Sequence, residues 1–285
     1  MRKPIVAGQF YPRGKEELIS SIEESFESEF GPGRLPAKRE PKKLYGAITP
    51  HAGYRFSGAG AARVFKEVGE SAFPRVYVMI GVNHSGPETC VSDEDWETPL
   101  GVVKRDKELV KALAKKGMTI DNEAHHGEHS IEVQLPFLQY ISKDHEEELR
   151  IVYVMIADDD YERWGKMILD AVEESVKEAV FICSSDFTHY GDNYGYTPFV
   201  GDVKQNMEKL DKAAADFIVK KDPAGFLAYT NKTRATICGK YGIAVLLWIM
   251  SQIRKPRGKS IGYYTSGDVL GNYENAVGYA SITFS

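Results

Sequence analysis

Three apolar, strand-like segments of the sequence are followed at once by a titratable side chain. His51 comes just after LYGAIT, His84 comes just after RVYVMIGV, and Asp186 closes AVFICSSD, with His189 shortly behind it. In open α/β sheets the carboxyl ends of parallel strands meet at one edge, and ligands bind there. We therefore expect these four side chains to converge on one site.

A thiol joins this set from a distant part of the chain. The stretch TICGKYGIAVLLWIM places Cys238 at the start of the most apolar predicted helix. A helix amino terminus favours negative charge, so we expect Cys238 to be favoured as a thiolate. The neighbouring Gly239 has no side chain and permits close approach of a ligand or of another chain segment.

The segment HHGEHSIE contributes Glu128 and His129, which lie at the start of another predicted helix and can point into the same cleft. The remaining histidines, His125, His126 and His145, are expected to be solvated. Simpler interpretations stay open for the main candidates. A lone loop histidine is often a surface hydrogen-bonding residue, and Asp186 could cap the turn that follows it.

Two histidines and a cysteine can bind zinc with an open fourth position, or a redox metal such as copper or iron. Asp186 or Glu128 could orient a ligand histidine or act as a general base. A metal-free alternative uses Cys238 as nucleophile, His189 as base and Asp186 to orient it. The sequence contains no CxxC, HExxH, GxSxG, P-loop or Rossmann glycine motif, which disfavours those classes.

Short apolar runs alternate with helical patterns along most of the chain. Strands are predicted at 44–49, 75–82, 149–156, 179–186, 260–266 and 276–284. Helices are predicted at 57–69, 107–116, 129–141 (bent or split at Pro136), 161–178, 202–229 and 240–253. Continuously apolar strands between helices indicate a mainly parallel sheet covered on both faces, to which the terminal pair adds mixed or antiparallel edge strands.

The predicted fold class is therefore α/β, with a central sheet in a single three-layer α/β/α domain spanning residues 1–285. The Pro- and Lys-rich stretch 31–43 is expected to be an exposed connection.

Composition narrows the class of partner. A net charge of −5 argues against nucleic acid, because phosphate binding relies on a basic surface. The amino terminus lacks a signal-peptide core, and the apolar run 242–250 is too short to span a bilayer. Three cysteines suit a reducing compartment, with Cys90 and Cys183 expected to be core residues. We expect a cytoplasmic protein that binds neither nucleic acid nor membrane.

Several longer motifs resemble, in order, those of the Memo family, also known in bacteria and archaea as protein B of the AmmeMemoRadiSam system. They are PHAGYRFSG, GVNHSG, EHSIEVQLPFL, SSDFTHYG, the LDK-containing helix at 210–212, TICGKYGI and YYTSGD. The resemblance runs from about Pro4 to the last residues. It implies a fold similar to that of class III extradiol, non-haem iron dioxygenases, with a pocket where their active site lies.

The resemblance also implies roles for individual residues. His51, His84 and Cys238 match metal-ligand positions, and Asp186 and His189 match two further pocket residues. We expect the other pocket residues to be Tyr54, Glu128, His129 and Gly239. Members of the family are described as metal-binding redox proteins, with copper and iron both proposed. The animal member is described as binding a phosphotyrosine-containing receptor segment.

Two departures limit this transfer. The dioxygenase relatives complete their iron site with a carboxylate, whereas Cys238 takes that position here, so ring-cleaving activity is not inherited. Thr188 and Tyr190 stand where the animal-type motif has Cys and Trp. We do not expect phosphotyrosine signalling from a chain of this prokaryote-like type.

Three hypotheses follow. The first is a metal-dependent oxidoreductase that uses iron or copper, with zinc as a further option, and His189 as acid/base or additional ligand. The second is a non-catalytic module on a dioxygenase-like scaffold that binds a small molecule, a peptide or a partner protein associated with a radical-SAM enzyme. The third is a zinc- or cysteine-dependent hydrolase.

Overall fold

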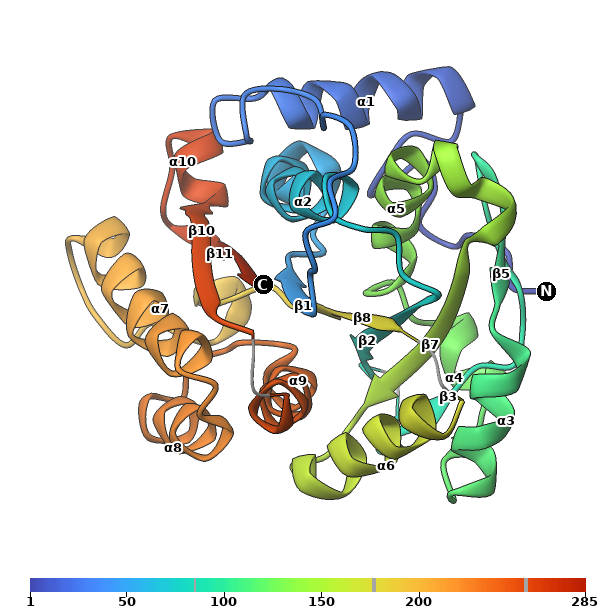
Figure 1. The fold of residues 1–285 in the computed structure, drawn as a ribbon. Coiled ribbons are helices and arrows are strands. Elements are labelled where there is room, and N and C mark those ends of the chain that lie inside the picture. Colours follow the sequence, from blue (N-terminus) through green and yellow to red (C-terminus); the bar gives the residue numbers. More distant parts are fainter. Residues whose placement is uncertain (85, 176–177, 254–255) are drawn as a thin grey trace.

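A computed structural model describes residues 1–84, 86–175, 178–253 and 256–285 (Figure 1). Within these residues, eleven strands join one sheet, whose main path runs β10-β11-β1-β8-β2-β7-β3-β6. The centre of the sheet is parallel. Its four strands, in spatial order, are β1 (Gly46–Thr49), β8 (Ala179–Ser184), β2 (Val76–Val82) and β7 (Arg150–Ile156).

Antiparallel strands flank this parallel centre, so the sheet is mixed as expected. On one side β11 (Asn275–Phe284) pairs with β1, and β10 (Gly258–Thr265) pairs with β11. On the other side β7 pairs with β3 (Cys90–Val91) in antiparallel and with β5 (Gly101–Arg105) in parallel orientation. The remaining short strands are β4 (Trp96–Thr98), β6 (Thr119–Ile120) and β9 (His189–Gly191).

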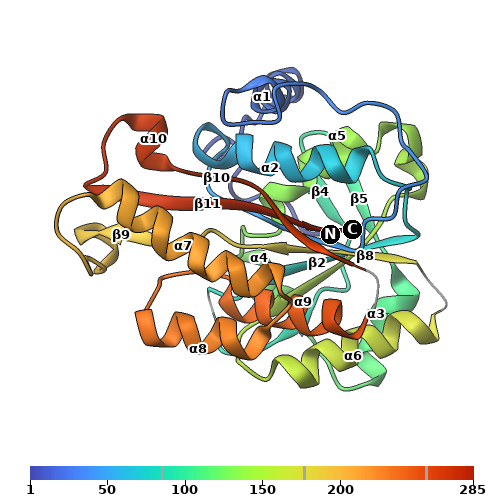
Figure 2. The ribbon, with the colours of Figure 1, turned by 60° about the vertical axis from the view of Figure 1, so that its left-hand side comes forward.

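Helices cover both faces of the sheet (Figures 1 and 2). One face carries α1 (Lys15–Glu27), α2 (Tyr54–Gly69) and α5 (Leu135–Ile141). The other carries α3 (Lys107–Lys115), α6 (Tyr161–Glu174), α9 (Lys240–Gln252) and α8 (Pro223–Thr233), with α7 (Val203–Val219) beside β10 and β11. Short helices complete the chain: α4 (Asn122–His126), α10 (Ser266–Leu270), η1 (Glu132–Gln134), η2 (Lys143–Glu148) and η3 (Asp192–Tyr194).

Two apolar cores lie on opposite faces of the sheet, and successive residues of the central strands enter them alternately. In β2, Val78 and Ile80 enter the core beneath α6 and α9, whereas Tyr77 and Met79 enter the core beneath α2 and α5. A strand buried on both faces needs apolar residues at every position. This burial explains why the central strands are continuously apolar in the sequence.

The predicted fold class is confirmed, and the differences concern boundaries and short elements. The helix expected at 129–141 is divided into η1 and α5, with Pro136 in the first turn of α5. The helix expected at 202–229 is two helices, because Lys221 adopts φ 58° and Asp222 caps α8. Residues 176–177 of the predicted helix 161–178 lie outside the described residues.

Strands β3 to β6 and β9 were not predicted, because segments of two to five residues are too short to show a hydrophobic period. The stretch 31–43 contains neither helix nor strand, and most of it is exposed. Among the described residues, no helix has both the length and the hydropathy needed to cross a bilayer.

Gly191 is a backbone constraint next to the candidate site. It adopts φ 121° and ψ 172°, a region that only glycine occupies readily. A Cβ added there would lie 2.3 Å from the carbonyl oxygen of Glu274, which is backbone and cannot rotate away. Gly191 therefore lets β9, which begins with His189, pair closely with the start of β11.

We predict that Gly191→Ala lowers the free energy of unfolding by about 3 kcal/mol, because backbone strain adds to the clash. Urea titration measures this loss. Gly195→Ala is the matched control, since Gly195 has φ 63° and open space around its Cα, and it should cost only about 1 kcal/mol. Equal losses in the two variants would contradict the assignment of a steric role to Gly191.

Candidate metal centre

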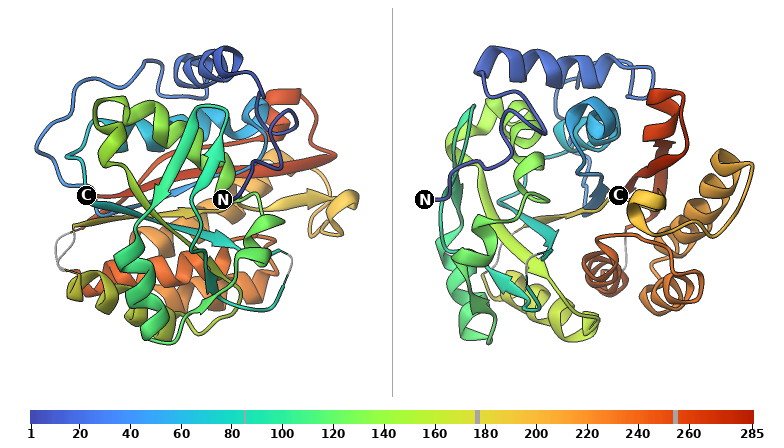
Figure 3. Two further views of the ribbon diagram at one scale, coloured as in Figure 1. Left: turned by 90° about the vertical axis from the view of Figure 1, so that its right-hand side faces the viewer. Right: turned by 180° about the vertical axis from the view of Figure 1, so that it is seen from behind.

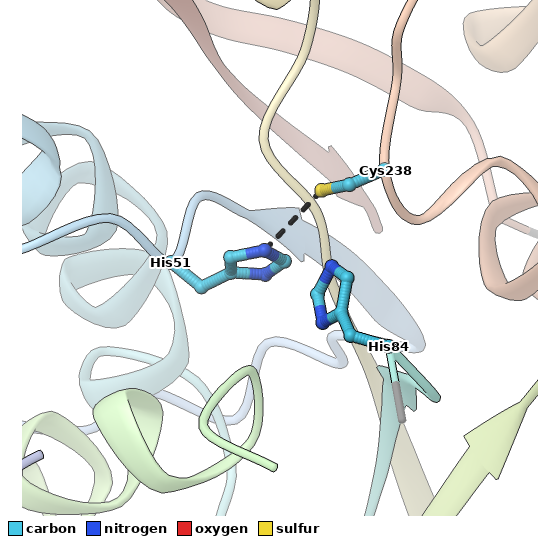
Figure 4. A group of neighbouring side chains, drawn as sticks. All are labelled: His51, His84 and Cys238. Carbon is cyan, nitrogen blue, oxygen red and sulfur yellow. Dashed lines mark hydrogen bonds between the residues drawn. The ribbon is translucent and has the colours of Figure 1, made fainter. Parts of the chain in front are cut away.

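The carboxyl ends of β1 and β2 lie on either side of β8, and the loops that leave them carry His51 and His84. The segment before α9 brings Cys238 to the same place. One nitrogen of each imidazole and the thiol sulfur all lie within 4.8 Å of one another. Figure 4 shows the two rings and the thiol turned toward a common centre.

The ring of His51 is buried, and its protonation pattern follows from its neighbours. Nδ1 lies 3.0 Å from Ser184 Oγ, which donates its one proton to the carbonyl of Ser130. Ser184 must therefore accept from Nδ1–H, so Nε2 keeps its lone pair. That lone pair faces Cys238 Sγ at 3.2 Å. The backbone N–H of His51 donates to Asp186 Oδ1 at 2.7 Å.

Burial lowers the pKa of His51 to about 4, an effect that the nearby Asp186 carboxylate only partly opposes. The imidazole is therefore neutral at physiological pH. A neutral imidazole is the form that binds a metal ion.

His84 is oriented in the same way by a carboxylate. Its Nδ1 lies 2.9 Å from Glu128 Oε2, and a carboxylate only accepts, so Nε2 is again left free. The hydrogen bond to Glu128 raises the pKa of His84, against an opposing effect of burial. This is the carboxylate–histidine arrangement that commonly supports metal ligands.

Glu128 itself is fully engaged by N–H donors. Oε1 accepts from the backbone of His129 and Ser130, and Oε2 accepts from the backbone and the ring of His84. Burial alone would raise the pKa of Glu128, but the hydrogen bonds from His84 and from the backbone hold it well below its usual range. A second possible ligand group, His84, Glu128 and His129, is therefore less suited to a metal, because its carboxylate oxygens already have partners.

The environment of Cys238 corrects the expectation of a thiolate favoured by the helix. Burial, and after it the Asp186 carboxylate, raise the pKa of the Cys238 thiol. Desolvation of a charged sulfur outweighs the helix terminus here. A coordinating cation deprotonates thiols outright, so a thiolate at this position calls for a metal ion.

Gly239 supports this arrangement through close packing. Its N–H donates to Ser185 Oγ at 2.9 Å, and an added Cβ would lie 2.5 Å from the Cβ of Ser185. Gly239 thus fixes the start of α9, where Cys238 sits, and it does not line the cavity described next.

A cavity of about 480 Å³ opens beside the three candidate ligands. Its polar lining includes His51, His84, His129, Asp186, His189 and Cys238, and its apolar lining includes Phe10, Phe56, Leu270, Val277 and Tyr279. The expected pocket residue Tyr54 instead lines a neighbouring cavity of about 710 Å³. Its hydroxyl is buried and donates to the carbonyl of Val133.

His189 and Asp186 both face the cavity, but no hydrogen bond among the described residues joins them. The Nδ1 of His189 donates to the carbonyl of Thr236 at 2.9 Å, which leaves Nε2 as an acceptor. Asp186 holds the backbone of His51, and the imidazole next to the Cys238 sulfur belongs to His51. The relay in which Asp186 orients His189 toward Cys238 is therefore not assembled.

Residues that the sequence did not nominate complete the supporting shell: Ser184, Thr236 and Asp211. Asp211 is fully buried and accepts from the backbone and hydroxyl of Thr188 and from the hydroxyl of Tyr263. It thereby holds the loop between Asp186 and His189. The LDK motif that contains Asp211 is the signal that could have found it, because the family resemblance already included that stretch.

The prediction that His125 is solvated is wrong. Its side chain is fully buried, Nδ1 lies 2.7 Å from the carbonyl of Asp121, and burial lowers its pKa to about 4. His126 and His145 are partly exposed, with carboxylate neighbours. Cys90 and Cys183 are buried core residues, as expected.

The fold and the site together define a three-layer α/β/α protein with a candidate His/His/Cys metal centre at the carboxyl edge of its sheet. A sequence profile described as Memo-like protein matches residues 2–283. The chain is 39% identical over 292 residues to a MEMO1 family protein of Methanopyrus kandleri, covering 99% of this chain and 98% of that relative. It is 38% identical to a MEMO1 family protein of Pyrococcus abyssi, with 99% and 98% covered. This chain belongs to the Memo family.

A solved structure shows the same fold at low sequence identity. An uncharacterised protein from Escherichia coli K12 superposes with a TM-score of 0.51 and 13% identity, covering 85% of this chain and 100% of that chain. At this identity the likeness concerns the fold alone.

We predict a pH-dependent stability that arises from Asp211. Burial raises its pKa to about 6, so between about pH 4 and pH 6 the folded chain keeps a proton that the unfolded chain has released. Stability from this group is thus complete at low pH and is lost as the pH rises through 6. Relative to Asp211→Asn, the free energy of unfolding of the parent should fall by about 3 kcal/mol between pH 4 and pH 7.

Urea titrations of the parent and the variant across that pH range measure the difference. Asp216→Asn is the control for removal of an aspartate from the same helix, because Asp216 is exposed whereas Asp211 is buried. If the difference between the parent and Asp211→Asn stays flat or rises with pH, the pKa of Asp211 in the folded parent is not raised, and the prediction is wrong.

Proposed function

We propose that this protein binds iron or copper through His51, His84 and Cys238 and acts as a metal-dependent oxidoreductase. The observation that carries the proposal is the matched presentation of the two imidazoles. Each Nδ1 is engaged by an acceptor, so that each Nε2 lone pair is turned toward the thiol. Ligand atoms within 4.8 Å of one another suit bonds of about 2.0 to 2.3 Å to a central ion.

The chemistry of the donors supports a redox-capable metal. Imidazole and thiolate ligands suit copper, iron and zinc, whereas magnesium and calcium prefer oxygen ligands. A bound iron or copper ion would supply one-electron redox chemistry at the wall of the cavity. Membership of the Memo family favours iron or copper over zinc, because the family resemblance implies a redox protein.

The remaining residues of the cavity prepare this site. Asp186 fixes the backbone of His51, and Glu128 fixes the ring of His84. The Nε2 of His189 is free to accept a proton at the cavity, because its Nδ1 is held by Thr236. The apolar side chains that line the cavity limit the access of water to a bound ligand.

The two other hypotheses have less support in the geometry. The cysteine hydrolase with His189 as base and Asp186 as its orienting residue is not assembled, because the imidazole beside the Cys238 sulfur belongs to His51. Burial also raises the pKa of that thiol, which disfavours a thiolate nucleophile. A non-catalytic binding module would not need two imidazoles with fixed tautomers beside a thiol. Ring cleavage is not part of the proposal, because the candidate ligand group with the free donor atoms contains no carboxylate.

We predict that anaerobically purified, untagged protein retains nearly one equivalent of iron or copper per chain. Cys238→Ser and His51→Ala should bind that metal at least about tenfold more weakly, because loss of even an outer partner of a ligand costs about 10- to 100-fold. Mass spectrometry of the metal content and competition with a chelator measure both effects.

Cys90→Ser is the matched control, since Cys90 is a buried thiol outside the site, and it should keep the metal. Full retention of metal by Cys238→Ser would rule out the ligand assignment. A parent protein that also refuses added iron and copper would overturn the proposed function.

His189→Gln separates metal binding from proton transfer. Glutamine retains an N–H donor for the Thr236 carbonyl but loses the imidazole base. We predict an unchanged metal content and a rate of oxygen uptake with ascorbate as reductant about 100-fold below that of the parent, within the range of general acid–base effects. Loss of the metal in this variant would instead make His189 a ligand.

A further inference from the structure

Arg2 lies at the start of the chain, where side chains are usually solvated, but its guanidinium is completely buried. It forms an ion pair with Glu132 at 2.8 Å and stacks over the ring of Trp96, 4.1 Å from the centroid. It also donates to the carbonyl oxygens of His125 and Glu128. Figure 3 shows the chain start lying beside strands β4 and β5.

Glu132, the ion-pair partner of Arg2, also accepts hydrogen bonds from other residues of the amino-terminal segment. The Glu132 carboxylate is buried and accepts from the backbone N–H groups of Ile5 and Val6 and from the hydroxyl of Tyr11. Residues 2–11 are thus fastened at several points to the segment 125–132. We call residues 2–11 the amino-terminal clamp.

The segment 125–132 is the one that orients a candidate ligand. Arg2 holds the main chain of Glu128, and the side chain of Glu128 holds His84. The guanidinium is therefore two hydrogen bonds from the imidazole that faces the metal position.

A second path leads from the clamp to the same imidazole. Phe10 stacks on His129, with centroids 4.8 Å apart, and His129 stacks on His84, with centroids 5.5 Å apart and nearly parallel planes. The carbonyl of Phe10 accepts from the backbone of Tyr54 at the start of α2. Gln9 and Phe10 also line the cavity.

A buried ion pair does not by itself stabilise a fold, because the cost of desolvating two charges offsets most of their attraction. Its effect is to specify one arrangement of the groups around it. Of the four partners of the Arg2 guanidinium named above, three lie in the segment 125–132: His125, Glu128 and Glu132.

We propose that the amino-terminal clamp is a built part of the metal centre, and that Arg2 is a positioning residue that holds Glu128, and through it His84, in place for the metal. The part of this proposal that concerns affinity for a metal rests on the proposed function. It also predicts an effect in metal-free protein, because the backbone N–H groups of His84, His129 and Ser130 are protected by the same carboxylate.

The test compares Arg2→Met with Lys3→Met and Ile22→Ala in untagged full-length protein. Lys3→Met is the matched control in the clamp, since the ion pair of the Lys3 side chain with Glu97 is exposed. Ile22→Ala is the stability control, since Ile22 is a buried core residue of α1. Thermal unfolding of each variant records the general loss of stability.

Hydrogen exchange of metal-free protein is measured first, at the amides of His84, His129 and Ser130. We expect exchange at least about tenfold faster in Arg2→Met than in Ile22→Ala, with Lys3→Met equal to the parent. Affinity for ferrous iron, measured without oxygen, should fall about 10- to 100-fold in Arg2→Met and stay unchanged in both controls. Exchange that is no faster in Arg2→Met than in Ile22→Ala would overturn the inference.

The two readouts separate the two proposals. If the parent binds no metal, the proposed function fails, but the exchange result still decides the role of Arg2. If Arg2→Met does not fold, Phe10→Leu provides the test, because it leaves the ion pair intact and removes the ring that stacks on His129. Faster exchange at His84 and His129 in Phe10→Leu supports the clamp, and unchanged exchange overturns it.

Discussion

The buried carboxylate of Glu128 is the interaction on which the candidate metal centre depends. A carboxylate placed out of water is costly unless its charge is met by donors. Here four N–H groups meet it, and they belong to His84, His129 and Ser130. Because the charge can be satisfied in only one arrangement of these donors, it sets the position of the loop after β2 relative to the segment before α5.

The other imidazoles of the site are also oriented by a hydrogen-bond acceptor at Nδ1. Ser184 accepts from Nδ1 of His51, and the carbonyl of Thr236 accepts from Nδ1 of His189. Each ring is therefore held as one tautomer with its Nε2 exposed to the cavity or to the thiol. Burial keeps the imidazole of His51 neutral, which is its metal-binding form, and it keeps the Cys238 thiol protonated in the absence of a coordinating cation.

The mixed sheet makes this convergence possible. Its parallel centre brings the ends of β1, β8 and β2 side by side, and the antiparallel strand β11 places β9 and His189 at the same edge. Two distant segments close the site. The start of α9 brings Cys238, and the amino-terminal clamp brings Phe10 onto the ring stack that ends at His84. The position of Cys238 depends on the close packing of Gly239 against Ser185. The position of the clamp depends on the hydrogen bonds from Arg2 to the carbonyl oxygens of His125 and Glu128.

The sequence by itself determined the fold class and most candidate ligands, because continuously apolar strands and the polar residues that end them are local patterns. His51, His84, Asp186 and His189 could be placed at one edge by the geometry of parallel strands alone. Cys238 was nominated by its position at a predicted helix start, and the family resemblance implied its role as a ligand. Only the tertiary structure decided which of these groups touch. In the structure Asp186 accepts from the backbone of His51, and His189 donates to Thr236. His125 is buried, and Tyr54 lines the neighbouring cavity. Arg2 is buried against the segment that carries Glu128. Such contacts join residues far apart in the chain, and desolvation depends on the whole packed surroundings, so no local pattern records them.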